Sequence, residues 1–267
     1  MTFIELILLG IFVGAVTGVT GASGVLVLVP ILSTFFSVPL DIILGTSLFV
    51  DVIASISVSF AYARAKNVEV RSTLWILIGS LLGAQIGSFF AISVSKVLIM
   101  LVLSFCVLFF GIKMWRTGST KNKHHDNSLL VSEESSSYFR TPLAMSLGGL
   151  IIGLSTGVFG AGGGLTVFLF LFYFLKFPLK KAVGTSTFIM LLTALSGVVG
   201  YAENGHLNIF LGVVVGGSAA VGGVLSSVLA NRIKEEFLAR IIGVTFIFFA
   251  MVMLLLKVLL PFFHISF

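Results

Sequence analysis

Apolar residues dominate this chain in long runs that short polar segments interrupt. A helix needs about 20 apolar residues to cross the ~30 Å hydrocarbon layer of a membrane. Runs of that length predict six membrane-spanning helices, at residues 42–63, 73–92, 96–115, 182–202, 207–229 and 237–259. The pattern therefore predicts an all-α polytopic membrane protein.

Two further apolar segments, residues 3–36 and 142–175, are longer than one span and are each broken by glycines. The breaks lie at 18–24 and 157–164. After each break about 12 apolar residues remain, which make ~18 Å of helix and cannot cross. Each segment is therefore either one broken crossing helix or a hairpin that enters the membrane and returns.

The two halves of the chain repeat each other, because residues 10–111 align with 149–250 without a gap. This alignment pairs the two glycine breaks, and it pairs Gly45-Thr46-Ser47 with Gly184-Thr185-Ser186. A weak two-fold repeat of apolar segments is typical of many membrane transporters. We expect repeat 1 at 3–115, a flexible linker at 116–140 and repeat 2 at 141–260.

The positions of lysine and arginine favour hairpins, because cytoplasmic loops collect positive charge. With two hairpins, 14 of the 16 basic residues lie on one side and only Lys96 and Lys257 on the other. Single crossings would divide them 9 against 7. Each repeat is thus expected to have three full transmembrane helices and a re-entrant hairpin, so the two repeats are inverted. Both termini are expected outside, and the linker in the cytoplasm.

Composition agrees with a membrane protein, since 58% of residues are hydrophobic and 10% are charged, against about 25% charged in soluble domains. The net charge of +6 does not indicate a nucleic-acid partner, because the basic residues lie in loops beside apolar spans. Glu5, with no basic residue before it, argues against a signal peptide. Cys106 is a single cysteine, and His124-His125 lacks companion ligands, so we expect no metal and no cofactor.

The glycine breaks are the strongest candidates for a binding site. Irregular backbone at membrane depth is tolerated where it is buried in protein or lines a wet cavity, and glycine lets backbone approach a ligand closely. The helices that start near Val25 and Leu165 would aim N–H groups and a positive helix end inward, which suits a small anionic substrate. We predict that the substrate-binding residues are Thr20, Gly21, Ser23, Gly24, Thr46, Ser47, Gly160, Gly162, Gly163, Gly164, Thr185 and Ser186.

Close helix packing through small residues is the alternative explanation for glycines in such helices. It accounts for Gly83, where alanine is expected to be mild. Asp51 is harder to explain by packing, because an ionisable residue in mid-span indicates function. Its equivalent is Met190, so its role, which we expect to be proton coupling or tuning of the site, breaks the symmetry. The equivalent tyrosines, Tyr62 and Tyr201, are expected to form a gate or a site wall.

The doubled pattern of glycine break, proline and Gly-Thr-Ser resembles the sulfite exporter TauE/SafE family of bacterial and archaeal membrane proteins. Pro39 and Pro178 each follow the last shared glycine by fifteen residues, and the resemblance covers nearly the whole chain. It implies secondary transport, usually export, of a sulfur oxyanion such as sulfite or an organosulfonate across the plasma membrane of a prokaryote. The first turn departs from the fuller glycine run of the second, since Ser23 lies opposite Gly162.

By this resemblance the family's glycine-rich turns correspond to 18–24 and 157–164, and its hydroxyl motif to Thr46, Ser47, Thr185 and Ser186. A passive anion channel and a non-catalytic membrane subunit remain as alternatives. A membrane-embedded enzyme is disfavoured, because no histidine lies in mid-span and Asp51 has no partner suited to catalysis nearby in the sequence. The pattern makes no prediction of the oligomeric state.

Overall fold

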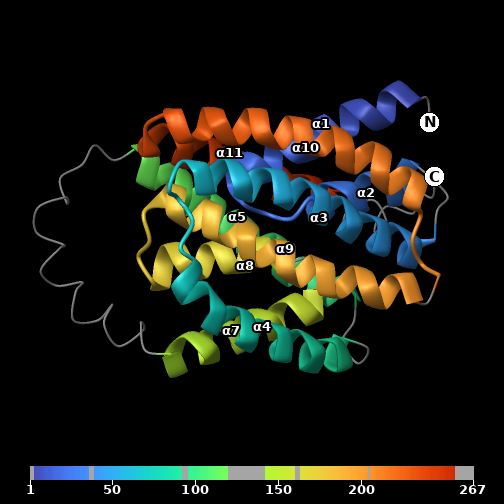
Figure 1. The fold of residues 1–267 in the computed structure, drawn as a ribbon, viewed down its shortest axis with the longest axis horizontal. Helices are drawn as coiled ribbons and strands as arrows, with labels where there is room; N and C mark the ends of the chain where they lie inside the picture. The colour runs from blue at the N-terminus through green and yellow to red at the C-terminus, as the bar shows by residue number, and fades with distance from the viewer. Residues whose placement is uncertain are drawn as a thin grey trace, which may run out of the picture.

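The structure is a computed structural model that describes residues 3–35, 39–91, 96–119, 142–159, 163–203 and 205–255. All regular elements in these ranges are helices, which form a bundle with most axes along its long dimension (Figure 1). This confirms the predicted all-α class. His124 and His125, with most of the expected linker, lie outside the described residues.

The first half contains α1 (Phe3–Thr20), α2 (Val25–Phe35), α3 (Leu40–Arg64), α4 (Val70–Ala91) and α5 (Lys96–Ser119). The second half contains α7 (Pro142–Phe159), α8 (Gly164–Leu169), the π-helical turn η1 (Phe170–Phe174), α9 (Leu179–Glu203), α10 (Ile209–Arg232) and α11 (Glu235–Leu254). The six predicted spans thus correspond to α3, α4, α5, α9, α10 and α11. The predicted glycine breaks separate α1 from α2 and α7 from α8.

The distribution of side chains is that of a membrane protein. Four helices in the described ranges are long and apolar enough to cross a membrane, at 3–20, 42–64, 179–203 and 209–232. Large apolar side chains such as Phe60 and Leu225 are 62% and 66% exposed, whereas Thr17 and Asp51 are fully buried. An apolar surface over an interior that buries polar as well as apolar side chains fits a chain whose surroundings are lipid.

Two helix pairs that join the halves are built in the same way. α1 packs along α10, and α7 packs along α4 (Figure 1). A Cβ atom added to Gly10 would lie 2.4 Å from the carbonyl oxygen of Val215, and one added to Gly149 would lie 2.2 Å from that of Ile76. Both positions of one contact differ by 139 residues from those of the other, so the two interfaces use equivalent residues.

A second pair of contacts repeats this relation. A Cβ atom on Gly222 would lie 2.2 Å from the carbonyl oxygen of Ile11, and one on Gly83 would lie 2.2 Å from that of Leu150. No side chain fits at such a distance from backbone, so the helices touch because both positions are glycine. The expectation that alanine at Gly83 would be mild is therefore wrong, since the α4–α7 backbones would have to separate.

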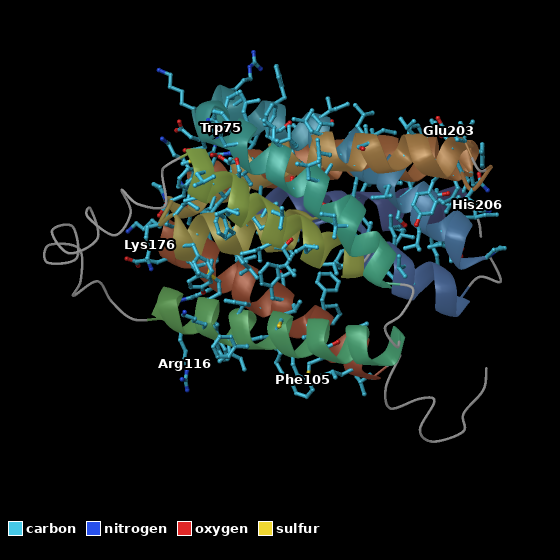
Figure 2. All side chains as sticks on the ribbon, turned by 90° about the horizontal axis from the view of Figure 1, so that it is seen from below. Trp75, Phe105, Arg116, Lys176, Glu203 and His206 are labelled. Carbon is cyan, nitrogen blue, oxygen red and sulfur yellow. The ribbon has the colours of Figure 1, made fainter. Side chains whose placement is uncertain are left out.

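Polar loops gather at one end of the bundle. Asn67 donates from Nδ2 to Oδ1 of Asn231 at 2.6 Å, and Lys180 donates from Nζ to the Asn231 carbonyl at 2.8 Å. These bonds bring together the end of α3, the start of α9 and the end of α10. Figure 2 shows Lys176 at this end of the molecule and Glu203 at the opposite end. α3 and α9 therefore run antiparallel.

Candidate functional site

The first glycine turn, residues 21–24, closes its own backbone hydrogen bonds. Gly21 has a φ of 67°, which glycine adopts without steric cost. Its N–H donates to the carbonyl of Thr17 at 2.9 Å. The N–H of Ala22 donates to Oγ1 of Thr20 at 3.1 Å, and that of Val25 donates to Oγ of Ser23 at 3.2 Å. Most donors of the turn are thus already bonded within the chain.

Asp51 completes this turn from the middle of α3. The N–H of Gly24 donates to its Oδ1 at 2.7 Å, and the hydroxyl of Ser23 donates to its Oδ2. The carboxyl group is fully buried. A carboxylate at a helix N-terminus is stabilised by the free N–H groups and by the helix dipole. Asp51 therefore caps α2 and fixes the first turn to α3.

The second glycine turn touches the first. Gly163 has a φ of 74° and caps α8. A Cβ atom on Gly164 would lie 2.7 Å from the carbonyl oxygen of Gly21 and 3.1 Å from the backbone nitrogen of Ser23. It would also lie 2.5 Å from Sδ of Met190, the residue equivalent to Asp51. Glycine at 164 is thus what lets the two turns meet. The predicted site residues Gly160 and Gly162 lie outside the described residues.

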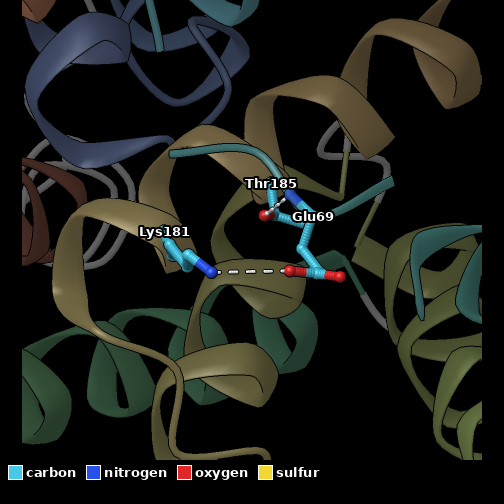
Figure 3. A network of polar contacts seen from close by, with 3 residues as sticks. All are labelled: Glu69, Lys181 and Thr185. Atoms are coloured by element: carbon cyan, nitrogen blue, oxygen red, sulfur yellow. Dashed lines mark hydrogen bonds and ion pairs between the residues drawn. The ribbon is translucent and has the colours of Figure 1, made fainter. Parts of the chain in front are cut away.

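The threonines of the two Gly-Thr-Ser motifs hold loops from the opposite half of the chain. Oγ1 of Thr185 accepts the N–H of Glu69 at 3.0 Å, while the carboxylate of Glu69 lies 3.5 Å from Nζ of Lys181 (Figure 3). The equivalent hydroxyl of Thr46 accepts the N–H of Asn208 at 3.0 Å. Both bonds stand immediately before a helix, α4 or α10, so these threonines have a structural role at the two ends of the bundle.

The glycines of the motifs make the same contacts possible. A Cβ atom on Gly45 would lie 2.1 Å from the carbonyl oxygen of His206, and one on Gly184 would lie 2.2 Å from that of Asn67. Figure 2 shows His206 beside Glu203, at the end of the molecule opposite Lys176. Each motif therefore accepts a loop of the other half against its glycine and bonds it through its threonine.

The serines of the motifs point to the region of the turns. The hydroxyl of Ser186 lies 2.9 Å from the carbonyl of Val183 and 3.3 Å from that of Gly21, so it reaches the first turn. Ser47 is fully buried, and its Oγ has no hydrogen-bond partner among the residues that the structure describes. Buried polar atoms without partners are uncommon, because each costs free energy unless water or a ligand satisfies it.

Two more buried hydroxyls share this condition. Oγ1 of Thr17 and Oγ of Ser55 have no hydrogen-bond partner in the described part of the chain. Ser55 lies one helical turn after Asp51 and Ser47 one turn before it, so the three share a face of α3. The equivalent face of α9 carries Ser186, Met190 and Ala194. Among the described residues, the unsatisfied hydroxyls thus belong to the first half, and two of them flank the carboxylate on α3.

The two predicted tyrosines lie against equivalent glycines of the two Gly-Thr-Ser motifs, because the Cβ atom of Tyr62 lies 2.7 Å from the position a Cβ on Gly184 would take. Tyr62 is fully buried, and its hydroxyl donates to the carbonyl of Gly18 at 2.9 Å, directly before the first turn. Tyr201 is partly buried, and its Cβ atom lies 2.9 Å from the position a Cβ on Gly45 would take. The two tyrosines therefore stand at equivalent positions in the two halves, and Tyr62 also borders the first turn.

The structure thus brings one group of predicted residues together, namely Gly21, Ser23, Gly24, Asp51, Gly164 and Ser186. It places Thr46 and Thr185 at loop contacts instead. Thr17 was not singled out from the sequence, although it lies one helical turn before Gly21 and so faces the break. Within the described ranges, no three His, Cys, Asp or Glu side chains gather as metal ligands would.

Comparisons with known proteins support membrane transport. The family model described as Sulfite exporter TauE/SafE matches residues 6–253. The chain is 26% identical to the probable membrane transporter protein YunE of Bacillus subtilis over 92% of this chain and 95% of that one. It is 30% identical to the probable membrane transporter protein MJ0441 of Methanocaldococcus jannaschii over 73% and 71%. No solved structure matches it.

Proposed function

The chain belongs to the sulfite exporter TauE/SafE family, and we propose that it is a secondary transporter that exports a small sulfur-containing oxyanion such as sulfite or an organosulfonate. Its relatives are named as probable membrane transporters, which supports transport as the general function. The observation that carries the proposal is the contact of the two glycine turns, where Gly164 lies against Gly21 and Ser23 in the interior of the bundle, near the buried carboxyl group of Asp51.

An anion is the substrate class that this region suits best. The starts of α2 and α8 both meet there, and helix starts present N–H groups and partial positive charge. All Lys and Arg side chains of the described helices belong to the first or last two turns of their helix. An anion would thus be held by dipoles and hydroxyls rather than by a full positive charge. Moderate affinity of that kind suits a carrier, which must release its cargo.

The substrate site that we propose consists of backbone and hydroxyl groups from both halves of the chain. Thr20, Gly21, Ser23 and Gly24 contribute the first turn, and 160–164 contribute the second. Ser47 and Ser186 would supply hydroxyls, and Tyr62 would form the wall beside Gly18. The proposal gives Thr46 and Thr185 an indirect part, because their hydroxyls already bond the N–H groups of Asn208 and Glu69.

The proposal includes two inverted repeats that alternate access around this site. Its support is the set of glycine contacts that recur at an offset of 139 residues, with α1 on α10 matching α7 on α4. The paired bonds of Thr46 and Thr185 follow the same offset. The equivalent helices α3 and α9 run antiparallel, which is the relation that inverted repeats require.

Re-entrant hairpins are also part of the proposal. α2 has 11 residues, which corresponds to about 16 Å of helix and half a membrane. It begins beside Asp51, midway along α3. The charge distribution would place the end with Asn67, Lys180 and Asn231 in the cytoplasm of a prokaryote, together with the linker. Both termini would then face outward.

The test is flux of radiolabelled sulfite into liposomes that contain the purified protein. We expect entry that saturates with sulfite concentration and that exceeds entry into protein-free liposomes. Entry that rises linearly to high concentration would support a passive anion channel instead. If neither sulfite nor an alkanesulfonate enters faster than into protein-free liposomes, the proposed substrate class is wrong.

A further inference from the structure

The start of α2 already holds an anion, which is the chain's own carboxylate. The carboxylate of Asp51 accepts hydrogen bonds from the N–H of Gly24, at 2.7 Å, and from the hydroxyl of Ser23. These are the donors that a substrate anion would use at this helix. The carboxylate and the substrate therefore require the same two groups, and both groups cannot bond fully to both anions at once.

Three further hydroxyl groups lie near the start of α2. Thr17 is fully buried, its Oγ1 bonds no described residue, and this atom lies 3.8 Å from the position of a Cβ on Gly24. Ser47 and Ser55, one turn before and after Asp51, are also buried, and their hydroxyls have no partner within the described ranges. Three unsatisfied hydroxyls beside one helix start indicate a site that is built to bond more oxygens than the carboxylate alone provides.

Electrostatics decides whether both anions can be present. Two negative charges about 4 Å apart in a protein of effective dielectric constant ~20 repel enough to weaken binding on the order of a thousandfold. Apart from Asp51 itself, the charged residues on the helices around it belong to end turns, and they are Glu5 on α1, Asp41 and Arg64 on α3, Lys180, Lys181 and Glu203 on α9, and Arg232 on α10. α2 carries no charged residue. No described cation is therefore placed to offset the repulsion.

We propose that the substrate anion replaces Asp51 at the start of α2, and that Asp51 takes up one proton when it does so. The carboxylate gains a proton from solvent and becomes a neutral carboxylic acid, while Ser23 and Gly24 turn their donors to the incoming anion. No other covalent bond forms or breaks. By linkage, protonation of Asp51 strengthens anion binding by the same factor by which anion binding favours protonation. The inference rests on the proposed function, because it assumes an anionic substrate.

The experiment measures binding and proton uptake in the same purified, detergent-solubilised protein. Ethanesulfonate is the probe, since its charge is fixed near neutral pH whereas sulfite itself takes up a proton there. Isothermal titration gives the affinity at several pH values, and an indicator dye in weak buffer gives the proton count. We expect about one proton taken up per anion bound, and an affinity that falls about tenfold per pH unit where Asp51 is ionised.

Three variants separate the proposal from a general effect of pH. Asp51→Asn should bind ethanesulfonate without proton uptake and with an affinity that does not change with pH. Ser23→Ala should bind more weakly while keeping the proton uptake. Glu203→Gln, which removes a carboxylate at the end of α9, should match the unmodified protein in both measurements.

Binding of ethanesulfonate without proton uptake in the unmodified protein would overturn the inference and leave the proposed function standing. Proton uptake that persists in Asp51→Asn would overturn it as well. If Asp51→Asn does not fold, the unmodified protein and Ser23→Ala still decide the question through the proton count. Failure of both ethanesulfonate and sulfite to bind at any pH would overturn the proposed function itself, and the inference with it.

Discussion

Single residues give the two glycine turns different chemical characters. Asp51 bonds Ser23 and Gly24 in the first turn, while its equivalent Met190 presents a thioether to Gly164 in the second. A carboxylate holds its donors by charge, whereas a thioether is a weak acceptor. The two turns are therefore equivalent in backbone position but differ in the side chain that contacts them. A ligand between them would meet a carboxyl group on one side and a thioether on the other.

Gly164→Ala tests whether the contact between the turns matters for transport. Its Cβ would meet the carbonyl of Gly21 at 2.7 Å, so the turns would have to separate. Overpacking costs about 1–3 kcal/mol. If this cost destabilises the conformation that transports, flux should fall roughly tenfold to hundredfold. Sulfite flux in liposomes is the measurement. Gly200→Ala, whose Cβ would meet nothing within 4 Å, is the control and should transport normally.

The sequence alone predicted that Asp51 and the glycine breaks were unusual, because charge and irregular backbone are both rare in mid-span. It did not predict that Asp51 bonds Ser23, since the two are 28 positions apart and their meeting depends on how α2 packs against α3. It also grouped the hydroxyls of Thr185 and Ser186 as ligands. Successive helical residues point in different directions, and here the threonine faces a loop while the serine faces the turn.

At the scale of helices, the interfaces between α1 and α10 and between α4 and α7 depend on glycine. Gly83→Ala and Gly222→Ala should both destabilise the protein by about 1–3 kcal/mol or more, because each Cβ would press on backbone that cannot rotate away. Thermal unfolding in detergent measures the effect. Gly217→Ala on α10, where a Cβ would meet nothing within 4 Å, should leave the melting temperature nearly unchanged. Equal melting temperatures for all three variants would contradict the proposed packing.

The two threonine contacts should be equivalent in energy. Thr46→Val and Thr185→Val each remove the acceptor of one backbone N–H, of Asn208 or Glu69, and should cost about 1–2 kcal/mol each. The serine variants Thr46→Ser and Thr185→Ser keep the hydroxyl and should restore most of the stability. Denaturation in detergent would show this. If valine and serine variants are equally stable, the bonds do not hold the loops.

Helix positions were predictable because each membrane span can be recognised by its length and apolar content. Which helices pack against each other could not be predicted from the sequence. α1 packs on α10 of the other half. In the sequence this packing is marked only by glycines such as Gly10, and that Gly10 lies against Val215 is known only once both helices are placed. The error at Gly83 has the same origin, since a small residue on an apolar helix has the same appearance in the sequence whether it meets lipid or backbone.

At the scale of the whole molecule, each half is held by helices of the other. α1 and α7, which lead into the two glycine turns, pack on α10 and α4 of the opposite half. A change in the angle between the halves would therefore move both turns relative to α3 and α9. This geometry supports a mechanism in which one half rocks against the other around the turns.

Topology is the first test at this scale. Single cysteines at Asn67, Ser93, Lys180 and Asn204, in a Cys106→Ser background, should react with an impermeant reagent from two different sides. Asn67 and Lys180 should label together from the cytoplasmic side, because both positions bond Asn231 at one end of the bundle. Ser93 and Asn204 should label from outside. Labelling of Asn67 and Lys180 from opposite sides would contradict the inverted arrangement.

The most direct test of the central claim, that the protein is a carrier of sulfur oxyanions, is a counterflow measurement. Liposomes that contain the protein are loaded with unlabelled ethanesulfonate at high concentration and diluted into medium with a trace of radiolabelled sulfite. A carrier that alternates access exchanges one anion for the other, so we expect that label transiently accumulates inside above its external concentration. Simple equilibration of label without this overshoot, or no entry beyond that of protein-free liposomes, would contradict the account.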